Sequence, residues 1–470
     1  MHEYPYIVGG QARSGSEGSF EVIEPATGKP FARCAAAGRE QLDEAVALAR
    51  QAFAGWRCSS HEQRGAALSN IAADIEADAE AIARLIVREQ GKPLALAMNE
   101  VMGGVAWARY RAAQQLPVEV IEDSGQNRIE LHRRPLGVVA SITPWNWPFM
   151  IAVWHIMPAL RAGNCVISKP SSLTPLSTLK LGEIIARHVP AGVMSVLTGV
   201  GGLGGAMAAH PGIDKIVFTG STQTGQRVMR DGAVNLKRLT LELGGNDAAI
   251  VLPGSDVQQI AGPIFQAAFL NMGQTCAALK RLYVHRSIYQ PLCQALVGLA
   301  QQAVIGNGLE EGVTFGPVQN PDQLALVEAL VADARAQGAT VLCGGERLAG
   351  EGFFYPPTLV ADISDGSRLV DEEQFGPVLP IVAYDDVEEV LQRANASQFA
   401  LGGSVWGPDG EAAAALAARL ESGVAWVNCH AQIRPDTPFG GCKMSGYGVE
   451  FGQEGLLAFT AQQLLFRHKG

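Results

Sequence analysis

The chain has 470 residues, 46 of them acidic and 36 basic, which gives a formal net charge of −10. Hydrophobic residues make up 47% and charged residues 17%, so the chain can build large cores and is not a disordered protein. The acidic balance argues against a nucleic-acid or anionic-membrane surface. No stretch reads as a signal peptide or as a membrane span. We therefore expect a cytoplasmic protein of two to four domains, at about 100–200 residues per domain.

The cysteine and histidine patterns limit the possible chemistry. The eight cysteines are scattered and include no CxxC pair, and the nine histidines form no HExxH or HxxxH pattern. We expect mostly reduced, buried cysteines and no metal site built by the protein. Any chemistry must then come from single residues placed by the fold, or from a bound cofactor.

The N-terminal part is predicted to be helical, over residues 40–53 and 62–89, with Gly91-Lys92-Pro93 ending the second run. A half-exposed strand is predicted over 126–132. From residue 136 short apolar strands alternate with helices. The predicted strands are 138–142, 165–167, 193–197, 216–218 and 239–243, and the helices are 149–160, 176–188 and about 222–231.

A second alternating region follows, from residue 248 to about 427. Its first predicted strands are 249–252 and 282–285, and its first helices are 256–269 and 288–303. Strands that are apolar without alternation, separated by helices, indicate a parallel sheet covered on both faces. The sequence therefore predicts two α/β units, joined near Gly244-Gly245.

Two glycine-containing loops are candidates for binding a phosphate. Residues 199–204 match GxGxxG after a predicted strand, but no acidic residue follows in a second strand, which favours a plain loop. The better candidate is the segment 218–225, in which a strand runs into Gly220 and a helix opens at Ser221 or Thr222. Free helix N–H groups there would face a phosphate. The alternative is an ordinary Ser/Thr N-cap.

Three residues are candidates for catalysis. Cys276 follows Gly273-Gln274-Thr275 in a predicted loop. If its thiol is exposed, Cys276 is a candidate nucleophile; if the thiol is buried, Cys276 is a structural residue. Glu242 ends an apolar strand, where burial would raise its pKa towards the range of a general base; the alternative is a solvent-facing residue on an edge strand. Asn146 lies in a Trp/Pro-rich loop after strand 138–142 and is either an oxyanion donor or part of a packing corner.

These segments together resemble the aldehyde dehydrogenase superfamily, and the match runs over nearly the whole chain. The segments that carry it are Pro144-Trp145-Asn146, Ser168-Lys169-Pro170, Phe218-Thr219-Gly220-Ser221, Leu241-Glu242-Leu243-Gly244-Gly245, Gly273-Gln274-Thr275-Cys276, Glu373-Gln374-Phe375-Gly376-Pro377 and Pro438-Phe439-Gly440-Gly441-Cys442-Lys443-Met444-Ser445-Gly446. Seven ordered motifs of this length are very specific together.

The resemblance implies an α/β fold with two doubly wound parallel-sheet domains and a small β-flap for oligomerisation. It places the dinucleotide-binding domain at residues 1–115 and 135–245 and the catalytic domain at 246–445. The flap is expected at 116–134 and 446–470, in a homodimer or homotetramer.

The resemblance also implies the chemistry of an NAD(P)-dependent aldehyde oxidation. Cys276 would attack the aldehyde carbon, Asn146 and the Cys276 backbone N–H would hold the oxyanion, and Glu242 would activate water to hydrolyse the thioester. The residues expected around the cofactor are Thr143, Trp145, Lys169, Ser172, Thr219, Gly220, Ser221, Leu243, Glu373 and Phe375. Among them Lys169 would bind the adenosine ribose and Glu373 the nicotinamide ribose.

One departure from the family pattern concerns the choice of cofactor. The common pattern has an acidic residue three positions after the lysine, which prefers the free 2′-hydroxyl of NAD. Here that position is Ser172, which removes the repulsion against a 2′-phosphate. We expect NAD first, with NADP tolerated better than usual.

The expected substrate is a small aldehyde. The resemblance places a tunnel at Trp147, Met150, Trp154, Phe269, Ile433 and Phe439, a set that suits a hydrophobic or aromatic aldehyde, although several of these residues could instead fill core. Arg434 and His430 lie on one predicted loop. If either turned inward, an aldehyde carrying a carboxylate would be the better guess.

Three other readings stay open at this point. A CoA-acylating relative is opposed by Glu242, because a water-activating base is needed only for hydrolysis. A non-catalytic family member is opposed by the joint presence of Cys276, Glu242, Asn146 and Lys169. A thiol hydrolase would need a histidine base, for which His285 is the nearest downstream in the sequence.

Overall fold

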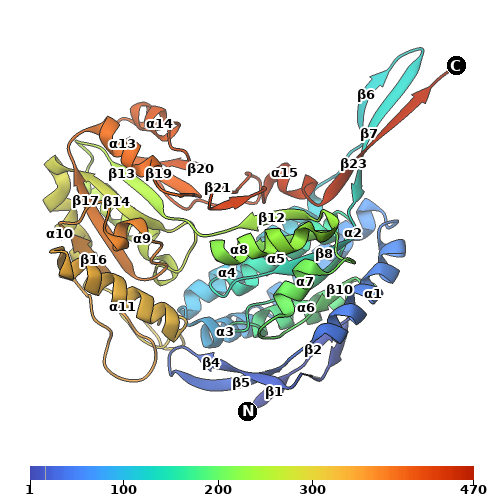
Figure 1. The fold of residues 1–470 in the computed structure, drawn as a ribbon, viewed down its shortest axis with the longest axis horizontal. Helices are drawn as coiled ribbons and strands as arrows, with labels where there is room; N and C mark the ends of the chain where they lie inside the picture. Colours follow the sequence, from blue (N-terminus) through green and yellow to red (C-terminus); the bar gives the residue numbers. More distant parts are fainter. Residues whose placement is uncertain (16) are drawn as a thin grey trace.

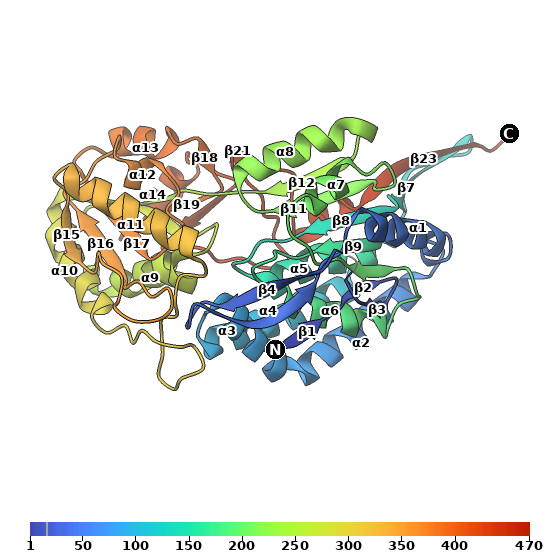
Figure 2. The same ribbon diagram turned by 60° about the horizontal axis from the view of Figure 1, so that its bottom comes forward.

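The chain folds into two α/β lobes and a projecting β-arm, as Figures 1 and 2 show for this computed structural model. The structure describes residues 1–15 and 17–470. Each lobe contains a sheet of mainly parallel strands, and helices pack on both faces of these sheets. The fold confirms the predicted α/β class with two doubly wound sheets.

The sheet of the first lobe has eight strands in the order β22-β12-β11-β8-β9-β10-β2-β3. Its five central strands run parallel, and β22, β2 and β3 pair antiparallel at its two edges. Their bounds are β2 Tyr6–Val8, β3 Gln11–Arg13, β8 Val138–Ile142, β9 Cys165–Lys169, β10 Met194–Val196, β11 Lys215–Thr219, β12 Arg238–Glu242 and β22 Gly446–Tyr447. β8, β10 and β11 are buried at every position, as a sheet covered on both faces requires.

The register of this sheet aligns the carboxyl ends of its central strands. Ile142 at the end of β8 pairs with Lys169 of β9 and with Phe218 of β11, and Thr219 pairs with Glu242 of β12. The last residues of four parallel strands therefore lie along one edge of the sheet. In open α/β sheets this edge is where ligands bind.

The helices of the first lobe include the five predicted runs, close to their expected bounds with one difference, and a long helix over residues 94–113 that was not predicted. They are α1 Arg39–Trp56, α2 His61–Ala77, α3 Ala79–Gln90, α4 Leu94–Ala113, α5 Pro148–Arg161, α6 Leu176–Ala186, α7 Leu203–Ala209 and α8 Thr222–Gly232. The run predicted as one helix over 62–89 is two, because Asp78 leaves the helical conformation between α2 and α3. Gly91 ends α3 with a φ of 100°, a left-handed conformation that favours glycine.

The N-terminal segment adds a small sheet of order β1-β5-β4 to this lobe. Its strands are β1 His2–Tyr4, β4 Ser19–Glu24 and β5 Lys29–Ala35.

The second lobe is built on a seven-stranded sheet of order β15-β16-β17-β14-β13-β19-β20, in which only β15 is antiparallel to its neighbour. The strands are β13 Asp247–Val251, β14 Leu279–His285, β15 Thr340–Cys343, β16 Thr358–Ala361, β17 Val378–Tyr384, β19 Gly402–Trp406 and β20 Val424–Val427. The α-helices are α9 Val257–Phe269, α10 Tyr289–Ala300, α11 Pro321–Ala336, α12 Arg368–Asp371, α13 Val387–Asn395 and α14 Gly410–Ala417. Separate hydrophobic clusters fill the two faces of this sheet.

The chain crosses between the lobes at Gly244-Gly245, directly from β12 to β13. It returns through β21 (Cys442–Lys443), which pairs with β18 (Phe399–Ala400), and then through β22, which pairs with β12. The crossing therefore starts at the carboxyl edge of the first sheet and ends at the amino edge of the second.

The projecting arm is a three-stranded antiparallel sheet of order β23-β7-β6 (Figure 1). Its strands are β6 Glu119–Asp123, β7 Asn127–Pro135 and β23 Thr460–His468, and the short helix α15 (Gly452–Leu457) leads into β23. Large hydrophobic side chains are exposed on or beside its strands, namely Val118, Val120, Ile121, Leu464, Leu465 and Phe466.

No helix within residues 1–15 and 17–470 is both long enough and apolar enough to cross a bilayer.

Candidate active site

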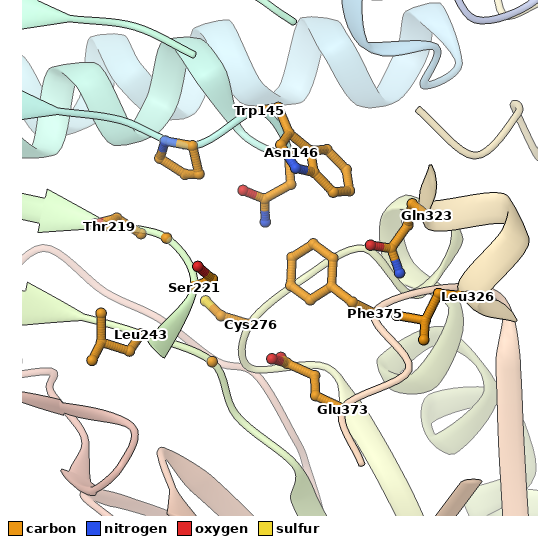
Figure 3. A pocket seen from close by; sticks show the side chains of 13 residues that line it. Trp145, Asn146, Thr219, Ser221, Leu243, Cys276, Gln323, Leu326, Glu373 and Phe375 are labelled. Atoms are coloured by element: carbon orange, nitrogen blue, oxygen red, sulfur yellow. The ribbon is translucent and has the colours of Figure 1, made fainter. Parts of the chain in front are cut away.

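A cleft of about 250 Å³ lies between the two lobes (Figure 3). From the first lobe, residues that follow the carboxyl ends of strands β8, β11 and β12 line it. From the second lobe come the segments that precede β14 and β17, together with α11. The lining residues are Pro144, Trp145, Asn146, Thr219, Gly220, Ser221, Leu243, Gly244, Cys276, Gln323, Leu326, Glu373 and Phe375.

The Cys276 side chain lies in this cleft, among Asn146, Ser221 and Phe375 (Figure 3). The segment before it turns tightly, because Asn271 and Met272 are both in the left-handed region, with φ of 53° and 56°. A partly exposed cysteine at the end of such a turn is presented to a ligand rather than packed away.

The thiol of Cys276 is protonated at neutral pH in this state. Burial raises its pKa to about 12, and the negative charges of Glu242, Glu373 and Asp247 add to this effect. Lys280 acts in the opposite direction on this thiol. Ionisation of Cys276 is therefore opposed first by burial and then by three nearby carboxyl groups, and it is favoured by the Lys280 ammonium.

Asn146 is fixed at both its side chain and its backbone. Its Nδ2 donates to the carbonyl of Gln274 at 2.9 Å, and its own carbonyl accepts from Asn271 Nδ2 at 2.9 Å and from Lys92 Nζ at 3.0 Å. A side-chain amide carries two N–H donors, so one remains for an oxyanion beside the nucleophile. The structure brings Asn146 and Cys276 into one cleft.

Glu242 is buried behind the cleft wall. Its side chain is 4% exposed, and neither carboxylate oxygen has a hydrogen-bond partner among the described residues. Burial, followed by the charge of Glu450, holds its pKa well above the usual carboxyl range. Its charge reaches the Cys276 thiol. A carboxyl in this state can take up a proton near neutral pH, as a general base requires.

Two further buried groups were not predicted: Glu450, whose charge acts on Glu242, and His155, which contacts Glu450. Glu450 Oε1 lies 3.3 Å from His155 Nε2, and the same nitrogen lies 3.0 Å from Thr219 Oγ1. The other ring nitrogen, Nδ1, lies 3.1 Å from Ser141 Oγ. His155 is fully buried on α5, so its sequence context reads only as a core position.

The loop from Thr219 to Ser221 forms one wall of the cleft, and the Ser221 hydroxyl is engaged within its own helix. Its oxygen accepts from the Thr224 backbone N–H and caps α8, which is the alternative that the sequence left open. The start of α8 nevertheless faces the cleft. The backbone N–H groups of its first two residues have no acceptor within the helix, because a helix leaves its first N–H groups unpaired.

Lys169 lies at the end of β9, and its Nζ donates to the carbonyl of Pro170 at 3.1 Å. Burial lowers its pKa to about 8, and no carboxylate contributes to its pKa. Its side chain passes the glycine loop, since a Cβ on Gly204 would come within 3.8 Å of it. Ser172 is partly exposed on the next turn of chain. Thr143 is buried just below this region, and its backbone N–H donates to the Lys169 carbonyl.

An aromatic pair frames the opening of the cleft. Trp145 and Phe375 pack edge to face, with ring centroids 5.3 Å apart. Phe375 has a φ of 43°, a conformation that is uncommon for a bulky residue and that its surroundings must enforce. Gln323 and Leu326 on α11 complete this side; they were not predicted, because nothing in a surface helix marks which residues reach the other lobe.

On the other side of Cys276 lies an aromatic cluster. It contains the predicted Trp154, Ile433 and Phe439, together with Trp107, Trp426, Phe451 and Cys429, which were not predicted. Phe451 lies 4.7 Å from the Trp154 ring and 5.8 Å from the Trp107 ring, measured between centroids. The thiol is therefore flanked by a polar cleft on one side and by aromatic rings on the other.

The structure places three of the expected tunnel residues outside that cluster. Phe269 is 3% exposed and stacks with Phe265 and Phe315 in the core of the second lobe. Trp147 donates from Nε1 to Thr275 Oγ1 at 3.0 Å. Met150 packs against α4 beside Gly103. Phe269 lies in the core because it is the last residue of α9 and is on the helix face that packs against the sheet.

Neither cation of the predicted loop turns towards the thiol. Arg434 is exposed and pairs with Asp436 at 2.6 Å. His430 is buried, with Nδ1 2.9 Å from Ser404 Oγ and Nε2 3.6 Å from Asp247 Oδ2. His285 lies at the far end of β14 beside Ser287, so it cannot serve Cys276 as a base.

The described residues contain no group of three or more His, Cys, Asp or Glu side chains that could hold a metal ion.

Comparison with known proteins decides the family. A sequence model of the aldehyde dehydrogenase family matches residues 12–465. The chain belongs to this family. It is 38% identical to phenylacetaldehyde dehydrogenase of Pseudomonas fluorescens over 475 residues, covering 98% of this chain and 95% of that protein.

Solved aldehyde dehydrogenase structures share the whole fold. The NAD+ complex of the Bacillus cereus aldehyde dehydrogenase has a TM-score of 0.97 at 33% identity, covering 100% of this chain and 97% of that one. An NADP dependent enzyme of Escherichia coli has a TM-score of 0.97 at 32% identity, covering 99% and 98%. The protein is thus an NAD(P)-dependent aldehyde dehydrogenase.

The described residues of this aldehyde dehydrogenase fit a nicotinamide dinucleotide. The cleft beside the thiol is open and framed by two aromatic rings, which suits a planar ring. Ser221, at the positive start of α8, also lines the cleft, and the first turn of α8 has no acidic residue. Lys169 lies at the carboxyl end of β9, along the same edge of the first sheet. Lys169, Glu373 and the loop 219–221 are the groups that would hold the dinucleotide.

Alkylation of the cofactor-free enzyme tests the state of the nucleophile. Because the pKa of Cys276 is raised to about 12, its reaction with iodoacetamide should accelerate by about tenfold per pH unit from neutral to alkaline pH, without a plateau. Peptide mass spectrometry would follow Cys276, with exposed Cys58 in the same digest as the internal control for reagent. A rate that levels off near neutral pH would show that the thiol is already ionised.

Proposed function

We propose that this aldehyde dehydrogenase oxidises a hydrophobic or aromatic aldehyde to the carboxylic acid through a covalent adduct on Cys276. The observation that carries this proposal is the aromatic cluster of Trp107, Trp154, Phe439 and Phe451 packed beside the thiol. The similarity to a phenylacetaldehyde dehydrogenase supports it. An aldehyde with a carboxylate is disfavoured, because Arg434 points into solvent.

In the first step, the Cys276 thiol releases its proton to solvent and the thiolate attacks the aldehyde carbon, so a C–S bond forms and the carbonyl π electrons move to oxygen. Asn146 Nδ2 and the Cys276 backbone N–H donate to that oxygen and stabilise its charge. Asn146 suits this role because its amide is already oriented by Gln274. Bound NAD(P)+ supplies the hydride acceptor that turns the adduct into a thioester.

In the second step, Glu242 takes a proton from a water molecule, whose oxygen attacks the thioester carbon. The C–S bond breaks, and the proton held by Glu242 passes to the departing sulfur, which regenerates the thiol of Cys276. Glu242 starts without a hydrogen-bond partner, so its carboxyl is free to turn towards the thioester and hold that water. Its raised pKa also makes it a stronger base than an exposed glutamate.

We keep NAD as the first choice of cofactor, with NADP as an accepted alternative. Ser172 supports the alternative, since it puts no negative charge near the ribose that Lys169 would bind. We further propose that the arm and its exposed Leu464 and Phe466 are covered by a second copy, in a homodimer or homotetramer. The eight free cysteines support a reducing compartment such as the cytoplasm.

A panel of aldehydes tests the proposed function. The purified enzyme is mixed with NAD+ or NADP+ and with aldehydes that differ in ring content, length and charge, and reduced nicotinamide is measured by absorbance. We expect aromatic and long-chain aldehydes to have kcat/KM values at least about tenfold above those of carboxylate-bearing ones.

The Cys276→Ala variant is the control in this assay: it should bind cofactor and turn over nothing. A preference for carboxylate-bearing aldehydes would overturn the substrate proposal, and a requirement for CoA would overturn the hydrolytic one.

Replacing the general base should separate the two chemical steps. In Glu242→Gln the amide cannot take the proton from water, so we expect a burst of about one equivalent of reduced nicotinamide and then a rate at least about 100-fold below wild type. Stopped-flow absorbance measures both phases. A steady rate equal to wild type would mean that another group activates the water.

A carboxylate introduced at the ribose end should change the cofactor preference. In Ser172→Glu a 2′-phosphate would face a like charge, so kcat/KM for NADP+ should fall by about tenfold or more relative to that for NAD+. The control variant Ser171→Glu adds the same charge one position away and should change this ratio less. An unchanged ratio in Ser172→Glu would remove Ser172 from the cofactor site.

A further inference from the structure

Lys280 is a buried lysine four residues after the nucleophile, near the start of β14. Its side chain is 2% exposed. The ammonium Nζ donates to the backbone carbonyl of Cys276 and lies 3.1 Å from Glu373 Oε1. It also lies 5.6 Å from the centroid of the Phe375 ring. A lysine is rarely buried so completely unless its charge has a partner, and here the partners are parts of the cleft.

The contacts of Lys280 join three segments that are distant in the sequence. Glu373 Oε1, which faces the ammonium, also accepts from the Gly245 backbone N–H at 3.0 Å. The Lys280 carbonyl accepts from Gln374 Nε2 at 3.0 Å, so the 373–375 segment is bound twice to this strand. The nucleophile loop, the crossing between the lobes and the segment of Glu373 therefore meet at one ammonium group.

We infer that Lys280 is a positioning residue of the active site: it sets the Glu373 carboxylate against the nucleophile loop and keeps a cation beside the Cys276 thiol. The inference rests on the proposed function, in which Glu373 binds the nicotinamide ribose and Cys276 is the nucleophile. It adds a residue that touches neither substrate nor cofactor and acts through these two.

The charges around the thiol explain why one ammonium matters. The charges of Glu242, Glu373 and Asp247 oppose the ionisation of Cys276, and the charge of Lys280 favours it. Without Lys280 the thiolate would form beside three carboxylates. Glu373 would also lose its ionic partner and keep only the Gly245 N–H, so its carboxylate would no longer be held in one position.

A purely structural lysine would behave differently. Its replacement would lower the stability of the fold and the yield of active enzyme, but the folded enzyme would keep the pH profile of its thiol and its KM for cofactor. Replacing a positioning lysine changes both the pH profile and the KM, and a replacement that keeps the positive charge restores the pH profile. The test therefore compares Lys280→Met, Lys280→Arg and Glu373→Gln in the full-length protein.

The chain offers a matched control in Lys443. Its Nζ also donates to a backbone carbonyl, that of Asn395 at 2.7 Å, and pairs with a carboxylate, Glu421, at 2.6 Å. It lies on β21, and its charge does not act on Cys276. Lys443→Met removes an ion pair and a bond to a backbone carbonyl from a more exposed lysine, away from the thiol.

Two measurements are made on each variant. The first is the rate of iodoacetamide alkylation of Cys276 against pH, followed on its peptide without cofactor. In Lys280→Met we expect the whole profile to shift to higher pH by about one unit, which is about a tenfold slower reaction at a given pH. Lys280→Arg should stay within about threefold of wild type, and Lys443→Met should not shift.

The second measurement is the steady-state KM for NAD+ or NADP+, with the aldehyde that the wild type prefers. Lys280→Met and Glu373→Gln should each raise it by about tenfold, and the double variant should raise it by less than the product of the two, because the two side chains act as a pair. Additive effects would show that Lys280 does not act through Glu373.

The outcomes separate this inference from the proposed function. If the wild type oxidises aldehydes and Lys280→Met leaves both the alkylation profile and the cofactor KM unchanged, Lys280 is structural and the inference is wrong. If the wild type oxidises no aldehyde, the proposed function fails, and the alkylation profile still decides whether Lys280 acts on the thiol. If Lys280→Met does not fold, Lys280→Gln and Glu373→Gln decide it, and unshifted profiles in both overturn it.

Discussion

The active site depends on how closely the backbone can approach at the crossing between the lobes. A Cβ on Gly245 would come within 2.6 Å of the Cys276 carbonyl oxygen, and one on Gly244 within 2.2 Å of Glu373 Oε2. A side chain at position 245 would push the nucleophile loop away, and one at position 244 would displace the Glu373 carboxylate. The two glycines let one short stretch of chain carry Glu242 from the first sheet and still contact the catalytic parts of the second.

The crossing also explains where the chemistry lies in each lobe. In the first lobe the functional segments follow the carboxyl ends of parallel strands, the usual ligand edge. In the second lobe they precede β14 and β17, at the amino ends. The cleft therefore forms between opposite edges of two sheets, and its carboxylates and its buried ammonium come from both. The pKa values of Cys276 and Glu242 are both raised, so this thiol and this carboxyl favour their uncharged forms, while Lys280 and Glu373 form an ion pair beside them.

Local sequence predicted the elements and the motif residues, but not the contacts between segments. The strand at 138–142 was predicted at its observed bounds, because every one of its side chains is buried. The break at Asp78 was missed, since helical periodicity continues on both sides of it. Phe269 was placed in the tunnel although α9 turns it into the core, and Glu450 was missed, because its role depends on β22 returning beside β12. Contacts between segments that are distant in the sequence decide where such residues lie, and local sequence patterns do not reveal these contacts.

The most direct measurement is the mass of the Cys276 peptide after a single turnover. The Glu242→Gln enzyme is mixed with NAD+ and a preferred aldehyde, quenched in acid within one burst, and digested for mass spectrometry. We expect the Cys276 peptide to gain the mass of the acyl group, in an amount matching the reduced nicotinamide formed. An unmodified Cys276 peptide, or an acyl group on another cysteine, after a full burst would contradict it.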